Sequence, residues 1–157
     1  MAIQVGEKIP NVTIKTSGMQ DISTGDLCAG KKVVIFSVPG AFTPTCSEQH
    51  FPGFIRHAAD IKSKGVDVIA CMSVNDSFVM DAWAKDRGAG DDITLLADGN
   101  AEFAKALGLE MDGTGIGFGT RAQRFALVID DGTVSHVAVE EPMQFDVSSA
   151  EKVLEAL

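Results

Sequence analysis

The sequence predicts an α/β fold in which a central mixed β-sheet is flanked by helices. Three apolar, β-branched runs have the character of buried strands: 31–38, 66–74 and 93–97. Amphipathic stretches separate these runs, as is typical of parallel strands joined by helical crossovers. Two further runs, 124–129 and 133–139, flank the pair Asp131-Gly132, which favours the tight turn of an antiparallel hairpin.

The longest helix is expected from Thr45 to about Lys64, with Phe51, Phe54, Ile55, Ala58 and Ile61 forming its buried face. Pro52 lies inside this stretch and should kink the helix or change its register. The remaining helices are expected from an Asp76 cap towards Arg87, from an Asn100 cap to Gly108, and from Ser148 or Ser149 to the C-terminus. This order of elements outlines a thioredoxin-like fold with an N-terminal extension, arranged as a single domain over residues 1–157.

Composition limits the possible functions. With 45% hydrophobic and 22% charged residues, the chain has the make-up of a soluble globular domain. A formal net charge of -9 disfavours a nucleic-acid partner. No apolar run approaches the roughly 20 residues of a membrane-spanning helix, and the N-terminus lacks the pattern of a signal peptide. A cytoplasmic location without membrane contact is therefore expected.

The three cysteines, Cys28, Cys46 and Cys71, are few and widely spaced. They fit neither a disulfide framework nor a structural zinc site, and they suit a reducing compartment. Cys46 is the one placed for chemistry, because it follows a strand end at the expected start of a helix. The unpaired N–H groups of a first helical turn stabilise a thiolate there. Thr43 occupies the position where a dithiol motif would have its second cysteine, so disulfide exchange within the motif is excluded.

Pro39-x-x-x-Thr43-x-x-Cys46 resembles the active-site signature of the peroxiredoxins. The longer string from Val38 to Ser47, followed by His50 and Pro52-Gly53-Phe54, is similar to the type II, or peroxiredoxin 5, subfamily. Further similarities cover essentially the whole chain: Gly65-Val66, Cys71 to Asp76, Leu95 to Asp98, and Arg121-x-x-Arg124-Phe125.

The resemblance implies a thiol-dependent peroxidase that reduces hydrogen peroxide and organic hydroperoxides, without metal or organic cofactor. It implies that Cys46 is the peroxidatic cysteine, that Thr43 donates to the peroxide and that Arg124 aligns sulfur and peroxide. Pro39 would shield the sulfur from water. The resemblance also implies a homodimer.

Four further residues are candidates for substrate contacts, and one glycine-rich segment suggests an alternative function. Pro44 and Thr45 are expected beside the peroxide, and Ile116 and Phe118 in an apolar wall for organic hydroperoxides. The glycines between Gly113 and Gly119 resemble a phosphate loop only superficially, because no strand leads through them into a helix. A flexible loop beside the pocket is expected instead.

Five other side chains could in principle take part in the chemistry. Arg121 is the rival of Arg124. His50 is expected to be structural rather than the base of a Cys-His hydrolase, and His57 and His136 are too scattered for a metal site. Trp83 is expected to pack in the core.

The chain departs from those relatives that carry a second, resolving cysteine near the C-terminus, because residues 141–157 contain none. Cys71 is expected in the core and Cys28 without a catalytic part. A one-cysteine enzyme follows, recycled by glutathione with glutaredoxin or by thioredoxin. A redox sensor that passes oxidation from Cys46 to a partner protein is the alternative, and it predicts little turnover.

Overall fold

The computed structural model describes all 157 residues and is built on a seven-stranded mixed sheet with the order β2-β1-β5-β4-β3-β8-β9. These strands are β1 (Thr13–Lys15), β2 (Asp21–Ser23), β3 (Lys32–Ser37), β4 (Val68–Ser73), β5 (Ile93–Ala97), β8 (Phe125–Asp130) and β9 (Thr133–Val139). The central strands β3, β4 and β5 pair in parallel, and the other pairs are antiparallel. The predicted mixed sheet and thioredoxin-like fold are confirmed.

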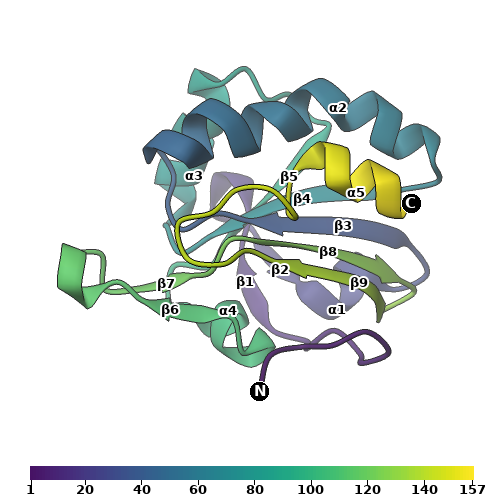
Figure 1. The fold of residues 1–157 in the computed structure, drawn as a ribbon, viewed down its shortest axis with the longest axis horizontal. Helices are drawn as coiled ribbons and strands as arrows, with labels where there is room; N and C mark the ends of the chain where they lie inside the picture. Colours follow the sequence, from purple (N-terminus) through teal and green to yellow (C-terminus); the bar gives the residue numbers. More distant parts are fainter.

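Helices cover both faces of the sheet, as Figure 1 shows. They are α1 (Thr24–Cys28), α2 (Phe51–Ser63), α3 (Ser77–Asp86), α4 (Glu102–Leu107) and α5 (Ala150–Ala156). Side chains of β3 alternate between the two faces: Val34 and Phe36 pack towards α2, α3 and α5, whereas Val33 and Ile35 pack towards α1 and α4. Because both faces are buried, the central strands read as continuous apolar runs. None of these helices has the length and apolarity needed to cross a membrane.

Pro52 changes the register of the long helix as predicted. The turn before α2, Cys46–His50, is a π-helix, in which the Phe51 N–H bonds the Cys46 carbonyl five residues earlier. A proline at position 52 has no N–H, and its ring would collide with a carbonyl in a regular α-helix. The wider turn accommodates the ring. Cys46 and His50, at the two ends of this turn, are both buried.

Most of the predicted helix ends and turns are confirmed. The Asp76 carboxylate accepts from the Val79 N–H and caps α3, and Ser149 caps α5 through the Lys152 N–H. Gly108 ends α4 in the left-handed conformation, at φ 70°. Asp131 and Gly132, at φ 47° and 79°, form the turn between β8 and β9.

The predicted Asn100 cap of α4 is wrong. The residue before the helix is Ala101, in the left-handed region at φ 58°. The capping oxygens come from further back along the chain, because the buried Asp98 carboxylate accepts from the N–H groups of Phe103 and Ala104. Asp98 thus caps α4 in place of Asn100. The left-handed conformation of Ala101 allows the Asp98 carboxylate to reach the first N–H groups of the helix.

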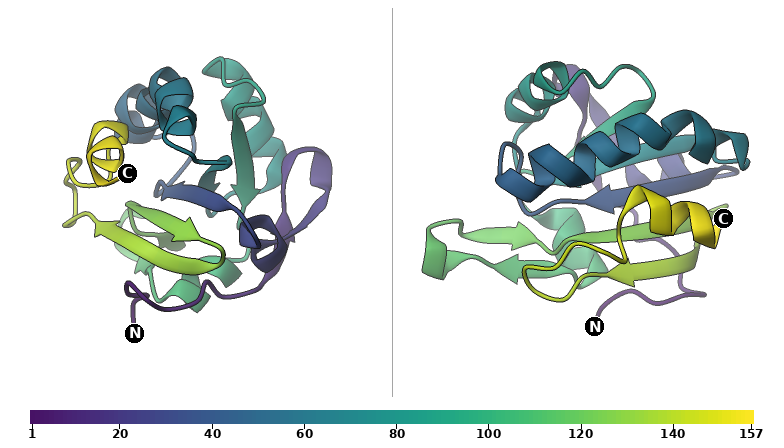
Figure 2. Two further views of the ribbon diagram at one scale, coloured as in Figure 1. Left: turned by 90° about the vertical axis from the view of Figure 1, so that its right-hand side faces the viewer. Right: turned by 45° about the horizontal axis from the view of Figure 1, so that its top comes forward.

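Two small features were not predicted. The N-terminal extension contributes β1 and β2 to one edge of the sheet. The glycine-rich segment lies at the end of a separate hairpin, β6 (Glu110–Asp112) with β7 (Thr120–Ala122), which projects from the body of the molecule in Figures 1 and 2. The segment between these strands is ordered by hydrogen bonds such as that from the Gly113 N–H to the Gly119 carbonyl, at 2.7 Å.

Candidate active site

Cys46 lies where the loop after β3 enters the long helix. The Val38 N–H bonds the Met72 carbonyl at 3.1 Å, which anchors the loop to the end of β4. The Ala41 N–H donates to Asn75 Oδ1 at 3.0 Å, which ties the next part of the loop to the segment before α3. These bonds bring Cys46 to the first turn of the helix with only 1% of its surface exposed. Its sulfur is therefore held by a fixed backbone.

Arg124 and His50 complete the surroundings of the sulfur. Arg124 Nη2 donates to Cys46 Sγ at 3.1 Å, and Arg124 Nη1 donates to His50 Nδ1 at 2.9 Å. The other ring nitrogen, His50 Nε2, donates to the Ser148 carbonyl at 3.0 Å. Because a carbonyl can only accept, Nε2 carries the hydrogen and Nδ1 is the acceptor for Arg124. The guanidinium is thus fixed on one side by the imidazole and faces the sulfur on the other.

His50 stays neutral in this arrangement. Burial, and secondly the charge of Arg124, lower the pKa of His50 to about 3. The imidazole is surrounded by aromatic rings, with centroids 5.1 Å away for Phe36, 5.5 Å for Phe54 and 5.0 Å for Phe145. Arg124 is accordingly the cation that faces the sulfur, and a thiolate at Cys46 would be stabilised by it.

Arg121, the rival of Arg124, binds backbone carbonyls instead. Its Nε donates to the Phe118 carbonyl at 3.0 Å, and its Nη1 lies 3.4 Å from the Pro39 carbonyl and 3.5 Å from that of Val74. A side chain at Gly40 would meet Arg121 Nη1 at 3.0 Å, so a glycine there allows this approach. Arg121 therefore supports the loop around Pro39, and Arg124 is the arginine at the sulfur.

Thr43 is oriented differently from what the sequence led us to expect. Its hydroxyl donates to the Gly40 carbonyl at 2.7 Å. With its hydrogen used in this way, the oxygen presents lone pairs, which can accept a hydrogen bond from the O–H of a hydroperoxide. Donation from Thr43 to a peroxide would require the hydroxyl to leave Gly40. Pro39, at the start of this loop, is half-buried.

The four candidate substrate contacts are more exposed than Cys46. Pro44 is exposed and Thr45 half-buried at the helix start. Ile116 lies in the turn at the end of the β6–β7 hairpin with 70% of its surface exposed. Phe118 is half-buried, and its ring centroid lies 5.1 Å from Arg121 Cζ. Their contact with a substrate stays a prediction.

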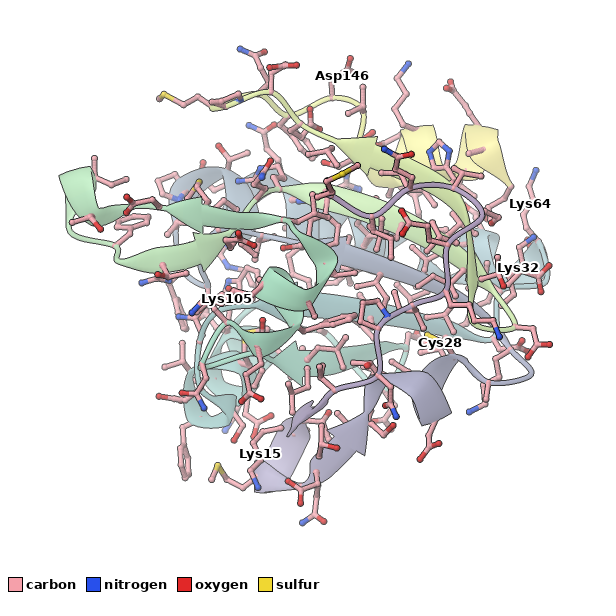
Figure 3. The ribbon with its side chains drawn as sticks, turned by 90° about the horizontal axis from the view of Figure 1, so that it is seen from below. Lys15, Cys28, Lys32, Lys64, Lys105 and Asp146 are labelled. Carbon is pink, nitrogen blue, oxygen red and sulfur yellow. The ribbon has the colours of Figure 1, made fainter.

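The other two cysteines are buried thiols. Cys71 lies in the middle of β4 and shares a core with Cys46; burial, and secondly the proximity of Cys46, hold the pKa of Cys71 well above its usual value. Cys28 belongs to the core on the opposite face, and burial raises its pKa to about 11. Cys28 is the last residue of α1, and Figure 3 shows it away from the loop that carries Asp146. Both thiols are kept protonated near neutral pH, which makes them poor nucleophiles.

The sequence did not reveal the residues that hold His50 and Arg124 from the C-terminal side. These are Glu140, Phe145 and Ser148, on and next to the loop of residues 141–149. The four-residue spacing of Cys46 and His50 was a signal for the histidine. No local pattern points to the others, because their partners lie far away in the sequence.

A thioredoxin-like fold that presents one cysteine to a guanidinium defines a thiol-based redox protein. Comparison with known proteins identifies the kind. The family model described as Redoxin matches residues 4–154. The chain is 49% identical to peroxiredoxin-2B of Arabidopsis thaliana, covering 99% of this chain and 98% of that protein. It is 48% identical to the chloroplastic peroxiredoxin-2E of the same plant, covering 99% and 70%.

Among solved structures, reduced Prx3 of Vibrio vulnificus in complex with H2O2 is 54% identical, with a TM-score of 0.94 and 99% of both chains covered. The chain therefore belongs to the redoxin family and, within it, to the peroxiredoxins. The type II resemblance of the sequence agrees with these relatives. Its activity is that of a thiol-dependent peroxidase, which takes a peroxide as substrate and a thiol as reductant.

Proposed function

We propose that Cys46 is the thiol that reduces the peroxide, and that Arg124 aligns and stabilises the reacting atoms. The observation that carries this assignment is the contact of Arg124 Nη2 with Cys46 Sγ, in a guanidinium already fixed by His50. Hydrogen peroxide and organic hydroperoxides are the proposed substrates. The complex of the Vibrio vulnificus relative with H2O2 supports the first of these.

The reaction is a displacement at oxygen. The Cys46 thiolate attacks the terminal oxygen of the hydroperoxide, an S–O bond forms and the O–O bond breaks, which gives a sulfenic acid. The departing oxygen gains negative charge and takes a proton to become water or an alcohol. Arg124 is placed to stabilise this charge, and the lone pairs of Thr43 can hold the O–H of the substrate. Pro39 is proposed to shield the sulfur from water.

We propose that the sulfenic acid is then reduced by an external thiol, supplied by glutathione with glutaredoxin or by thioredoxin. A first thiol forms a mixed disulfide with Cys46 and releases water; a second thiol breaks that disulfide and restores Cys46. Residues 141–157 contain no cysteine, and Cys28 lies on the opposite face of the sheet. Cys71 is completely buried in a central strand. These three observations support a one-cysteine cycle.

A cytoplasmic homodimer completes the proposal. Free, buried thiols suit a reducing compartment. Phe42 and Phe78 are 51% and 71% exposed, and the bond from Ala41 to Asn75 brings their two segments together. Large exposed aromatic side chains are typical of protein interfaces. Sedimentation of the wild type and of Phe78→Asp tests this: a dimer that becomes a monomer supports the proposal, and a wild-type monomer refutes it.

The activity itself is tested by counting peroxide molecules consumed per protein molecule, with excess glutathione and glutaredoxin or with thioredoxin and its reductase. Many turnovers with at least one of the two systems are expected. Consumption that stops after one equivalent with both systems would instead indicate a sensor that passes its oxidation to a partner protein.

A further inference from the structure

Glu140 is a buried carboxylate with no part in the reaction just described. It follows β9 directly and only 8% of its surface is exposed. One carboxylate oxygen, Oε2, accepts three hydrogen bonds: from the Asp146 N–H at 2.6 Å, the Ser148 N–H at 2.9 Å and the Ser148 hydroxyl at 2.7 Å. Burial by itself would raise the pKa of Glu140, but the donors of Ser148 and Asp146 bring it below the usual value. Glu140 is therefore an anion. Its side chain holds Asp146 and Ser148, near the end of the loop of residues 141–149, against the residue that precedes the loop.

That loop touches the active site at two points. The Ser148 carbonyl accepts from His50 Nε2 at 3.0 Å. The Phe145 ring lies 5.0 Å from the His50 ring, and Arg124 Cζ lies 5.8 Å from the Phe145 centroid. The loop therefore contacts both His50 and Arg124, the two side chains next to Cys46. The orientation of His50, and through it that of Arg124, therefore depends on where the loop places Ser148 and Phe145.

Glu140 is also linked to Arg124 directly. Its backbone N–H donates to the Arg124 carbonyl at 3.0 Å. The two residues are therefore neighbours, Arg124 just before β8 begins and Glu140 just after β9 ends. Glu140 thus bonds the backbone of Arg124 directly. Its side chain also bonds the loop that holds His50, the hydrogen-bond partner of the Arg124 guanidinium. Two independent contacts thus bear on the same arginine, one on its backbone and the other, through Ser148 and His50, on its guanidinium.

We propose that Glu140 is a positioning residue for peroxide reduction, which acts through Ser148 and His50 to aim Arg124 at Cys46. This inference rests on the assignment of Cys46 and Arg124 above. Glu140 touches neither substrate nor sulfur. It fixes the carbonyl that sets the tautomer of His50, and the free Nδ1 of that tautomer accepts from Arg124. Without Glu140, three donors lose their acceptor and the loop can move away from the imidazole.

The test is the second-order rate constant for reaction of the reduced protein with hydrogen peroxide. The fluorescence of the single tryptophan, Trp83, provides the signal, because its Nε1 bonds the Ser47 hydroxyl next to Cys46. Glu140→Ala should slow the reaction by about 10- to 100-fold, the scale of a small misplacement of a catalytic group. Glu140→Gln should slow it by no more than about fivefold, because its amide oxygen still accepts the three bonds.

A double-mutant cycle separates positioning from general destabilisation. In the Arg124→Ala background, Glu140→Ala should change the rate by less than about twofold, because the group it positions is already absent. Glu141→Ala is the matched control, since it removes an exposed carboxylate from the same loop and should leave the rate unchanged. If Glu140→Ala does not fold, Glu140→Asp replaces it; the shortened side chain withdraws the carboxylate from the loop, and the rate should fall between those of the wild type and Arg124→Ala.

Two results would overturn the positioning role: a wild-type rate in Glu140→Ala (or in Glu140→Asp, where that variant replaces it), or an equal slowing with and without Arg124. Failure of the underlying assignment looks different. In that case Cys46→Ser or Arg124→Ala itself would reduce peroxide as fast as the wild type, whatever residue occupies position 140.

Discussion

The neutrality of His50 makes stability depend on pH in a way that can be calculated. The pKa of this histidine is about 3 in the folded protein, against 6.5 for an unperturbed side chain. Below 6.5 the unfolded chain takes up a proton that the folded protein does not. The stability contributed by a neutral His50 is therefore complete above that value and is lost as the pH falls towards 3. Between about pH 8 and about pH 5 the loss amounts to about 2 kcal/mol.

The perturbation that removes this effect is His50→Gln. A glutamine can donate to the Ser148 carbonyl and accept from Arg124, but it does not titrate. Urea unfolding at about pH 8 and about pH 5 gives the free energy of unfolding of each protein at each pH. The decrease between the two pH values should be smaller in His50→Gln than in the wild type by about 2 kcal/mol. A loss of stability that is the same at both pH values cancels, because only the difference between them is compared.

His136→Gln is the matched control, because that histidine is half-buried on β9, whereas the side chain of Arg124 bonds His50 and Cys46. The free energy of unfolding of His136→Gln should keep the contribution of His50 to its pH dependence. Equal pH dependence in the wild type and in His50→Gln would refute the argument. It would show that the imidazole takes up its proton in the folded protein at about the same pH as in the unfolded chain.

Three further predictions follow from the site and the fold. Arg124→Ala should slow the reaction with hydrogen peroxide by about 100-fold or more, as read by rapid kinetics, because the departing oxygen loses the guanidinium that stabilises its charge; if the rate is unchanged, Arg121 takes the role. Cys28→Ser/Cys71→Ser should retain most turnover with glutathione and glutaredoxin, and excess peroxide without thiol should convert Cys46 to the sulfinic acid, as seen by mass spectrometry; a dominant internal disulfide together with lost turnover would contradict this. Asp98→Ala should lower the free energy of unfolding by about 1–2 kcal/mol, because α4 loses its cap; an unchanged urea midpoint would refute it.

The parts of the fold that the sequence predicted are those set by local chemistry. The runs that became β3, β4 and β5 are apolar because the strands are buried on both faces. Asp131-Gly132 marks a turn because both residues adopt positive φ. By contrast, β1 and β2 are strands of three residues at an edge of the sheet, too short for a periodic pattern. The cap of α4 was misplaced because it depends on a left-handed alanine, which no propensity favours.

The site shows the same division. Cys46, Thr43 and Pro39 lie in one short segment, whose spacing could be read directly. Arg124 is 78 residues from Cys46, and its contact with the sulfur was inferred only from the resemblance to peroxiredoxins. Ser148 is 98 residues from His50. Such pairs are created by the packing of β8 and the C-terminal loop against the long helix. The spacing of the residues along the sequence therefore does not predict them.

The role of Cys46 is tested most directly by treating the reduced wild type and Cys46→Ser with an equimolar amount of hydrogen peroxide. The remaining peroxide and the mass of each protein are then measured. The wild type should consume the peroxide and gain one oxygen atom on Cys46, as a sulfenic acid that can be trapped. Cys46→Ser should leave the peroxide intact, because a serine hydroxyl stays protonated near neutral pH. Peroxide consumption by Cys46→Ser at the wild-type rate, with the oxygen found on Cys28 or Cys71, would contradict the assignment of Cys46.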